Sequence, residues 1–340
     1  MAFRIILIII AILVIVFLII PLSFGLTGDE KKKTNQPVSV ANANGSPLID
    51  GKTPLILARS HDEGHTWENT SLSESRVAFP AEIVRISFHP TNADIIFLGT
   101  KSNGAWKSNN RGKSWKKIVD VDNVLDAASA VYQIVIPQSN LRVMYMTVFQ
   151  KGYGRLLTSE DGGTSFKEIY FTPTPGVAIF DLMINPHNSQ HIIIGTSQGG
   201  LIESRDRGST WSVVHWFRSG IAQIFIHPNT TDIMFVETSD GGLFHTTDRG
   251  KTWTDLSGNV RQAGYTAQVT ISFFGAPQQQ SAPSRLVMDP HQFGTFYVAS
   301  GAGVFTSPDG GKTWKRLEIL IPPTAPPSPR TVAISPIDQY

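Results

Sequence analysis

An eight-residue motif recurs six times in the chain and constrains the fold more than any other feature. Each copy has Ser or Thr at the first and seventh positions and an aromatic residue at the eighth. The third, fifth and eighth residues of the copies are Asp62, Gly64 and Trp67; Asn110, Gly112 and Trp115; Asp161, Gly163 and Phe166; Asp206, Gly208 and Trp211; Asp248, Gly250 and Trp253; and Asp309, Gly311 and Trp314. Six copies in one order indicate a structural repeat rather than a single active site.

The motif has the composition of a tight turn between two strands. Its Asp and Ser/Thr side chains are suited to bind the N–H groups of a turn, and its Gly permits a positive φ. The aromatic residue is expected to return into the space between two sheets, where its burial stabilises the fold. Asn110 replaces Asp in the second copy, which a turn tolerates and a catalytic carboxylate would not. The motif is therefore predicted to be structural.

Each motif lies within a longer unit of short β-branched and aromatic segments. One strand precedes a proline (ISFHP, IVIPQ), a second ends near Gly-Thr (IIFLGT), a third enters the motif (GAWKS) and a fourth leaves it (WKKIV). Four strands bounded by Pro, Gly and Asn, repeated at intervals of about 45 residues, are typical of the blades of a β-propeller. The fold class is therefore all-β.

The two ends of the repeat region predict how the ring closes. Residues 46–67 align without a gap on residues 94–115, which supplies the second, third and fourth strands of a blade. Residues 330–336, RTVAISP, have the form of the missing first strand. The sequence thus predicts a six-bladed β-propeller closed by its C-terminal strand, which would remove the exposed sheet edge. A seven-bladed ring is the alternative, and it would need more chain.

The repeated motif resembles the Asp-box, also called the BNR repeat, and the resemblance covers about residues 46–336. Proteins with this repeat include sialidases, sortilin-type receptors, xyloglucanases and the photosystem II stability/assembly factor family. In these propellers the box looks structural and lies away from the functional face. The resemblance therefore implies the fold and leaves the activity open.

The N-terminal segment predicts delivery to or across a membrane. Residues 1–26 hold Arg4 followed by an unbroken apolar run from Ile5 to Ile20, which would reach about 24 Å as a helix. It reads as a transmembrane signal-anchor or as a cleaved signal peptide, and both alternatives stay open. Residues 27–45 read as a flexible polar linker and 46–340 as the propeller, predicted to lie outside the cytoplasm.

Composition excludes several classes of function. The chain has no cysteine, so disulfides, thiolate metal sites and cysteine nucleophiles are absent. Its 29 basic and 27 acidic residues give a net charge of +2, which argues against a nucleic-acid binder. His61 and His65 lie inside a turn motif and no other copy repeats them, so no metal site is predicted. No catalytic residue and no cofactor motif is assigned.

Partner binding is predicted on the face that carries the loops between second and third strands and the connections between blades. The connection 118–131 is acidic and mildly apolar, and residues 257–284 form a long insertion. Tyr265, Phe273 and Phe274 of that insertion either contact a protein partner or pack as a flap on their own blade. Trp106 and Tyr153 lie near loop tips, with the same two alternatives of rim contact and blade packing.

The sequence favours a non-catalytic module that serves as a protein-interaction scaffold, assembly factor or receptor. The assembly-factor family is the nearest analogue by size and by having one ring, whereas xyloglucanases resemble two propellers facing each other. The alternative is a carbohydrate-binding or glycoside-cleaving, sialidase-like propeller, which would need a clustered acid pair in the central channel. A glycan therefore stays a possible ligand beside a protein partner.

Overall fold

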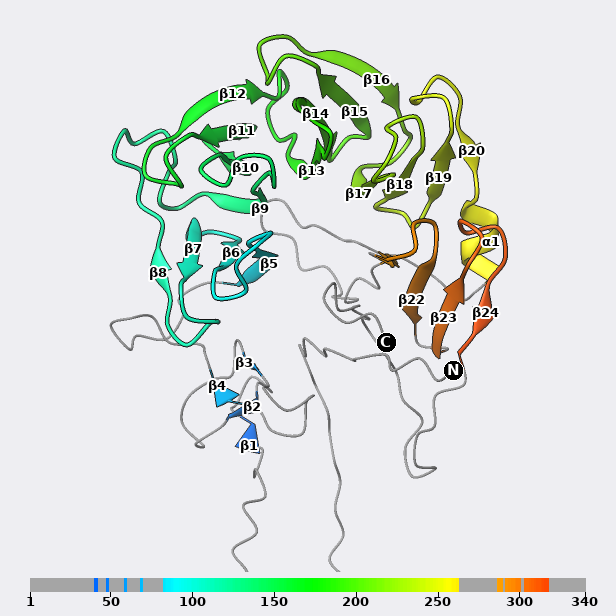
Figure 1. The fold of residues 1–340 in the computed structure, drawn as a ribbon, viewed down its shortest axis with the longest axis horizontal. Coiled ribbons are helices and arrows are strands. Elements are labelled where there is room, and N and C mark those ends of the chain that lie inside the picture. Colours follow the sequence, from blue (N-terminus) through cyan, green and yellow to red (C-terminus); the bar gives the residue numbers. More distant parts are fainter. Residues whose placement is uncertain are drawn as a thin grey trace, which may run out of the picture. The chain divides into compact units, whose positions relative to one another are not determined.

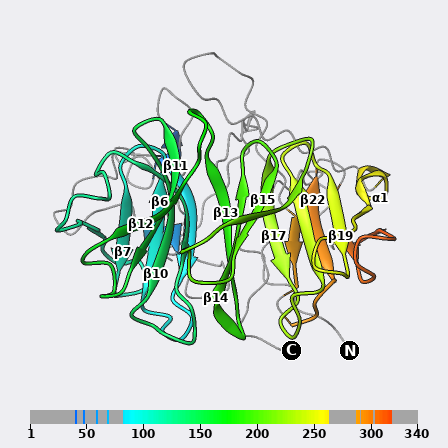
Figure 2. The same cartoon turned by 90° about the horizontal axis from the view of Figure 1, so that it is seen from above.

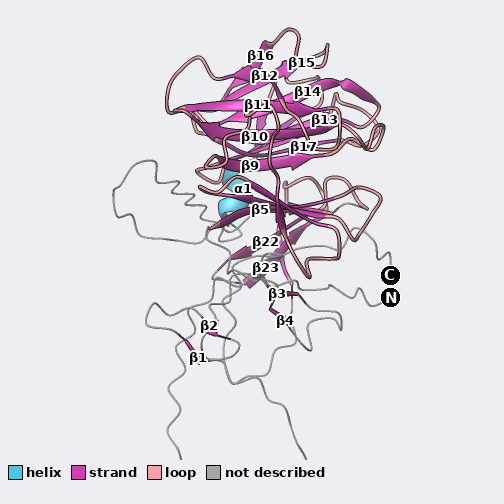
Figure 3. Ribbon diagram, turned by 90° about the vertical axis from the view of Figure 1, so that its left-hand side faces the viewer, coloured by secondary structure: helices cyan, strands magenta, loops and turns pink. Residues whose placement is uncertain are grey.

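The computed structural model describes residues 82–262, 286–289, 291–300 and 303–317, together with four two-residue strands between positions 40 and 69. Its described residues form five four-stranded antiparallel sheets, which follow one another in chain order (Figure 1). Each sheet is one propeller blade, and the blades are named A to E here. Strands supply nearly all of the regular structure, as Figure 3 shows.

The blades share one up-and-down order of strands. Blade A holds β5 (Ile83–Phe88), β6 (Ile96–Thr100), β7 (Ala105–Ser108) and β8 (Lys116–Lys117). Blade B holds β9 (Ala130–Val135), β10 (Met144–Gln150), β11 (Tyr153–Ser159) and β12 (Lys167–Phe171). Blade C holds β13 (Ile179–Asn185), β14 (Asn188–Thr196), β15 (Gly200–Ser204) and β16 (Ser212–Trp216). Blade D holds β17 (Ile221–Ile226), β18 (Met234–Thr238), β19 (Leu243–Thr246) and β20 (Thr254–Asp255). Blade E holds β21 (Leu286–Met288), β22 (Phe296–Ser300), β23 (Gly303–Ser307) and β24 (Lys315–Arg316).

Consecutive blades pack face to face through apolar cores. One core joins blades A and B around Phe97, Val131 and Met146, and equivalent cores join B to C, C to D and D to E. The first strands of neighbouring blades also contact each other, as β5 does β9 and β13 does β17, and Figure 2 shows β13 and β17 side by side. A single twisted sheet cannot bury both of its faces, so each blade depends on its neighbours for stability.

The Asp-box is the turn between the third and fourth strands of every described blade. In blade C, Ser204 Oγ donates to Asp206 Oδ1 at 2.8 Å, and the Gly208 N–H donates to Ser204 Oγ at 2.7 Å. The Thr210 N–H and hydroxyl donate to the same carboxylate at 2.8 and 2.6 Å. Blades B, D and E repeat this set of hydrogen bonds. In these four blades the motif therefore forms a hydrogen-bonded turn between two strands.

Blade A builds the same turn with an amide. Asn110 Oδ1 accepts hydrogen bonds from Ser108 Oγ and the Ser114 N–H, both at 2.9 Å. Its Nδ2 donates to Ser114 Oγ at 2.9 Å, which reverses the direction of the hydroxyl bond in the other blades. An uncharged side chain therefore satisfies the turn, because the serine hydroxyl can either donate or accept.

The Asp-box backbone is left-handed at its fourth and fifth positions. Arg207 and Gly208 have φ values of +60° and +91° in blade C, and Arg249 and Gly250 have +64° and +81° in blade D. The Arg207 N–H donates to the carbonyl of Gln190, in the first half of the same blade, at 2.9 Å. This conformation costs about 1–2 kcal/mol for a residue with a Cβ, so the hydrogen bonds of the turn must hold it in place.

The Asp-box directs its glycine and aromatic residue against the preceding blade. The Trp211 ring of blade C lies 4.8 Å from the Tyr170 ring of blade B, and its Nε1 donates to the Ile169 carbonyl at 3.1 Å. A Cβ placed on Gly208 would lie 2.9 Å from Ile169, so no larger residue fits there. Phe166 in blade B, Trp253 in blade D and Trp314 in blade E join the equivalent inter-blade cores.

The predicted number of blades is wrong. The described residues form five four-stranded blades, and the segment assigned to a further blade forms two separate two-stranded pairs instead. In that segment β2 (Pro47–Leu48) pairs with β1 (Val40–Ala41), and β3 (Ala58–Arg59) pairs with β4 (Glu68–Asn69). The β1–β2 pairing closes a short local loop, which costs less entropy than recruiting a strand from the far end of the chain. The proposed closing strand, 330–336, lies outside the described residues.

The first Asp-box lies between paired strands, as its sequence predicts. β3 ends just before this motif and β4 begins just after it, although Asp62, Gly64 and Trp67 themselves lie outside the described residues. The strands β1 to β4 belong to a unit, Ile10–Phe79, that is compact by itself. The paired strands β3 and β4 thus flank the first Asp-box in the sequence.

The sequence predicted one N-terminal membrane-spanning or signal helix as part of the fold. The structure gives this prediction no support. Among the described residues, no helix combines the length and apolar character needed to cross a bilayer. Residues 1–26 lie outside the described part of the chain. The described helix α1 (Ser257–Gln262) is one short segment at the start of the 257–284 insertion. An Asx-turn precedes it, in which Asp255 Oδ1 accepts the Ser257 N–H at 2.8 Å.

Replacing Arg207 with Gly is expected to stabilise the protein. Gly has no Cβ to strain the left-handed backbone, and the equivalent position is already Gly162 in blade B and Gly310 in blade E. Glycine relieves the backbone strain but increases the conformational entropy of the unfolded chain. The difference between these two effects predicts a gain of about 0.5–1 kcal/mol in the free energy of unfolding. Urea unfolding measures it. Arg207→Ala is the control, because it removes the side chain and keeps the strain, and an equal gain in that variant would contradict the explanation.

The Asp-box carboxylates are expected to make the fold sensitive to acid. Hydrogen bonds from Thr210 lower the pKa of Asp206 to about 2, and those from Thr252 lower the pKa of Asp248 to about 2. Because these folded pKa values lie below the ordinary value of 3.8 for an aspartate, the stabilisation is present above that pH and is lost as pH falls toward 2.

The double variant Asp206→Asn with Asp248→Asn tests this dependence. Asn110 already forms the same turn, so the variant should fold and lose part of the decline in stability between about pH 4 and pH 2. Urea midpoints across this range measure the effect. An unchanged slope in the double variant would show that other groups cause the acid sensitivity.

Candidate functional site

The innermost strands carry a polar network at equivalent positions. The pairing of the first strand with the second has a β-bulge in blades A to D, and the residue that follows it is Arg85, Gln133, Asp181 or Gln223. A bulge redirects the side chains beside it, so these residues leave the regular alternation of their strands. Three of them, from three different blades, meet at one carboxylate.

Asp181 is the centre of this network. Its Oδ1 accepts a hydrogen bond from Gln133 Nε2 at 3.0 Å and lies 3.4 Å from Arg85 Nη2. Its Oδ2 accepts the Ile224 N–H of blade D at 2.7 Å, and Arg85 Nε also donates to Gln133. The Asp181 side chain is 2% exposed and that of Arg85 is 17% exposed, so the carboxylate end of the ion pair is buried. One carboxylate thus connects four consecutive blades.

This arrangement suits a structural carboxylate better than a catalytic one. A glycosidase acid pair needs two carboxyl groups about 5–10 Å apart, one of them able to hold a proton. Both Asp181 oxygens are already engaged, Oδ1 by Gln133 and Arg85 and Oδ2 by the Ile224 N–H. The network, called the channel network below, therefore ties the first strands of four consecutive blades together.

The connection between blades A and B forms a second candidate site. Residues 118–129 link β8 to β9 and are longer than the connections 172–178 and 217–220 between the next blades. A cavity of about 250 Å³ lies against this connection. It is lined by Lys117, Ile118, Val119, Asp120, Asn123, Leu125, Asp126, Ala127 and Lys151. Two lysines and two aspartates thus share one recess.

Asp120 and Gln150 hold the connection in one conformation. Asp120 is buried, and its carboxylate accepts the N–H groups of residues 122, 124 and 125 at 3.0, 2.6 and 2.8 Å. It also accepts the Phe166 N–H of the blade B Asp-box at 3.2 Å. Gln150 bridges the Val124 carbonyl and the Asp126 N–H at 2.8 and 2.9 Å. The backbone of a long connection is therefore satisfied without a strand partner.

The same connection exposes two large apolar side chains. Val119 is 71% exposed and Val121 is 63% exposed, although the backbone between them is anchored by the buried Asp120. Their exposure contributes nothing to the packing of the blades. An ordered apolar surface beside a charged recess is typical of a contact region for another molecule.

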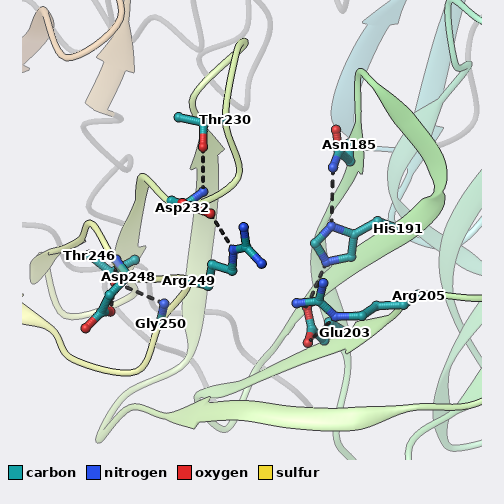
Figure 4. Close-up of polar contacts among 10 residues, drawn as sticks. All are labelled: Asn185, His191, Glu203, Arg205, Thr230, Asp232, Thr246, Asp248, Arg249 and Gly250. Carbon is teal, nitrogen blue, oxygen red and sulfur yellow. Dashed lines mark hydrogen bonds and ion pairs between the residues drawn. The ribbon is translucent and has the colours of Figure 1, made fainter.

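A buried histidine and glutamate form a third polar cluster, in blade C. His191 Nε2 lies 2.7 Å from Glu203 Oε2, and Arg205 donates to both oxygens of that carboxylate at 3.0 Å (Figure 4). Burial opposes ionisation of Glu203, but the hydrogen bonds from His191 and Arg205 outweigh it and lower the pKa of the carboxyl. The cluster is fully paired, which fits a structural role.

The neighbouring Asp-box carries a separate ion pair. Arg249 Nε contacts Asp232 Oδ1 (Figure 4). The backbone N–H of Asp232 donates to Thr230 Oγ1 at 3.2 Å, in the turn between β17 and β18. In the part of the chain that the structure describes, no group of three His, Asp or Glu side chains is arranged to hold a metal.

The predicted partner-binding residues fall in different surroundings. Trp106 is 9% exposed, and its indole N–H donates to the Asn103 carbonyl at 3.2 Å. Tyr153 is half-buried, with its ring 6.4 Å from the Phe171 ring. Tyr265, Phe273 and Phe274 lie outside the described residues, so their role stays a prediction.

The sequence showed the segment of the second site but not its anchoring residues. The 118–131 connection was recognisable because it interrupts the strand pattern with acidic and apolar residues. Asp120, Gln150 and Lys151 gave no signal, because their role depends on a loop folding back on the end of β10. Arg85 is one of several arginines in the sequence, and no motif singles it out.

Comparisons with known proteins agree with this geometry. A family model described as the BNR-Asp box repeat matches residues 106–118, which include the Asp-box of blade A. The chain is therefore a β-propeller that carries a BNR-Asp box repeat. A xyloglucanase from Paenibacillus sp is 26% identical over 199 residues, which cover 54% of this chain and 19% of that enzyme.

Solved structures share the same fold. The GH74 enzyme of Niastella koreensis superposes with a TM-score of 0.54 and 21% identity, over 76% of this chain and 42% of the enzyme. YCF48 bound to D1 peptide gives a TM-score of 0.45 and 14% identity, over 71% of this chain and 68% of YCF48. The chain spans less than half the length of the hydrolases it matches. At these identities the structural likeness shows the fold alone.

Replacing Asp181 with Ala is expected to destabilise the propeller strongly. The change leaves the Ile224 N–H, the Gln133 amide and the Arg85 guanidinium without a shared acceptor. Breaking a buried pair in this way costs about 3–5 kcal/mol in the free energy of unfolding. Asp122→Ala is the control, because Asp122 is exposed on the 118–129 connection. Urea unfolding compares the two, and equal stabilities would show that the network does not hold the blades.

Proposed function

We propose that this propeller is a non-catalytic binding module that docks a protein partner on the connection 118–129. The observation that carries the proposal is the exposure of Val119 and Val121, at 71% and 63%, on a backbone that Asp120 holds in place. A surface that is rigid before binding loses little conformational entropy when a partner docks. The ordering of this connection therefore supports a role in recognition.

The channel network supports the non-catalytic part of the proposal. Both oxygens of Asp181 are already engaged, by Arg85 and Gln133 on one side and by the Ile224 N–H on the other. The hydrolases among the similar proteins are much longer than this chain, so their activity is not carried over.

Glycan binding is the second candidate, and one side chain favours it. Trp216, at the end of β16, is 57% exposed, and a flat indole is a surface on which a sugar ring can stack. The outward location of the propeller also belongs to the proposal, and it depends on the apolar segment of residues 1–26. Protein binding is preferred because the connection 118–129 combines apolar and charged groups in one ordered region.

The test is site-specific cross-linking in cells that produce the full chain, with a photoreactive residue at position 123. Val119→Ser with Val121→Ser should reduce cross-linking to the same identified protein about tenfold, since two apolar contacts are lost. Val213→Ser is the matched control, because Val213 is 60% exposed on the outer strand of blade C. The captured protein must then bind again when both components are purified.

Two outcomes contradict the proposal. One is equal cross-linking by the double serine variant and by the original protein. The other is release of reducing sugar from xyloglucan or a sialoside by the purified protein, which would favour the glycoside-hydrolase alternative. Binding of glycans without hydrolysis, lost in Trp216→Ala, would support the second candidate instead.

A further inference from the structure

In the cavity beside the connection 118–129, the acidic side chains have more hydrogen-bond partners than the lysines. Its two acids are already used by the backbone: Asp120 accepts four N–H groups, and Asp126 Oδ1 accepts the Ala128 N–H at 2.8 Å. The two lysines are less well satisfied. Lys117 and Lys151 therefore supply the donors of the cavity, and Asp126 is the carboxylate whose charge opposes an anion there.

Lys117 is the inner cation. Its ammonium donates to the neutral side-chain oxygen of Asn103, and partial burial lowers its pKa, an effect that the Asp126 carboxylate opposes. An ammonium has three donors, and one neutral acceptor leaves two of them for a ligand. The loss of water around Lys117 strengthens its attraction for an anion that replaces that water.

Lys151 is the outer cation, on the turn between β10 and β11. Its backbone is left-handed, with φ of +51°, which the following Gly152 continues at +82°. Within the described part of the chain its ammonium forms no ion pair. The tight turn fixes the point from which this side chain projects beside the cavity.

We propose that this cavity binds the carboxylate of an acidic side chain in a protein partner, between Lys117 and Lys151. Apolar residues on either side of that acid pack on Val119 and Val121. The inference rests on the proposed function and names the partner's chemistry. A free anion would need only the lysines, whereas an extended acidic and apolar segment uses both the cations and the exposed valines.

The charge of the site can be changed in both directions. Lys117→Met with Lys151→Met removes the two cations and keeps much of their apolar stems. Asp126→Asn removes the opposing charge while retaining an oxygen that can accept the Ala128 N–H. A purely structural role for these residues would not strengthen binding in one variant and weaken it in the other.

The experiment uses the purified full chain and two pools of random peptides of about nine residues. One pool has Glu at its centre with Val or Leu on both sides, and the other has Gln in place of Glu. The original protein should retain the Glu pool about tenfold better, as a charged hydrogen bond contributes. The double Met variant should lose this preference, and Asp126→Asn should increase it.

Lys251→Met with Lys312→Met is the matched control, since it removes two exposed lysines from the Asp-boxes of blades D and E. It should keep the preference for Glu, and thermal unfolding of every variant checks that the fold is retained. Inorganic phosphate and a neutral xyloglucan oligosaccharide are tested as competitors. Competition by phosphate alone, with equal retention of both peptide pools, would assign the cavity to a small anion and overturn the proposal.

The result also separates this inference from the function on which it rests. If Val119→Ser with Val121→Ser abolishes partner binding while the double Met variant binds as well as the original, the surface is correct and the acidic chemistry is wrong. If neither variant changes partner binding, the connection 118–129 is not the contact surface.

Discussion

The packing of each Asp-box on the preceding blade is the constraint on which this propeller depends. A four-stranded blade exposes two apolar faces and is not stable alone. The hydrogen bonds between Ser204, Asp206 and Thr210 hold a left-handed turn. That turn brings Gly208 and Trp211 against Ile169 and Tyr170 of blade B. Local polar bonds thereby set the geometry of a long-range apolar contact, and the motif repeats because every inter-blade core needs it.

The channel network adds what a repeated motif cannot provide. Arg85, Gln133 and Asp181 occupy equivalent positions in three blades with different chemistry. Together with the Ile224 N–H they meet at one carboxylate. A buried ion pair adds little net stability compared with apolar residues of the same size, but a broken pair is costly. We interpret the network as a polar tie between the first strands of consecutive blades, because a displaced blade would leave a charge unpaired.

The fold was largely readable from sequence because its signals are local. The spacing of Asp, Gly and the aromatic residue predicts each hairpin, and even Asn110 was correctly read as a turn residue. The number of blades depended instead on whether Pro47–Leu48 pairs with a distant strand or with Val40–Ala41, and residue patterns do not decide between these. The candidate site was hidden for the same reason. Asp120, Gln150 and Lys151 converge only after the connection folds back on β10, and no spacing in the sequence encodes that contact.

The channel network and the connection 118–129 differ in how far they depart from the repeated blade. This difference distinguishes residues that stabilise the propeller from residues that contact another molecule. Arg85, Gln133, Asp181 and Gln223 occupy equivalent positions in blades A to D. Their differences in chemistry therefore act within the ring itself. The connection 118–129 is instead longer than the connections 172–178 and 217–220, which join blades adequately. Its extra backbone requires Asp120 and Gln150 as dedicated partners, yet it leaves Val119 and Val121 in solvent. We interpret a connection that is held in one conformation and yet leaves two valines in solvent as a contact surface for another molecule.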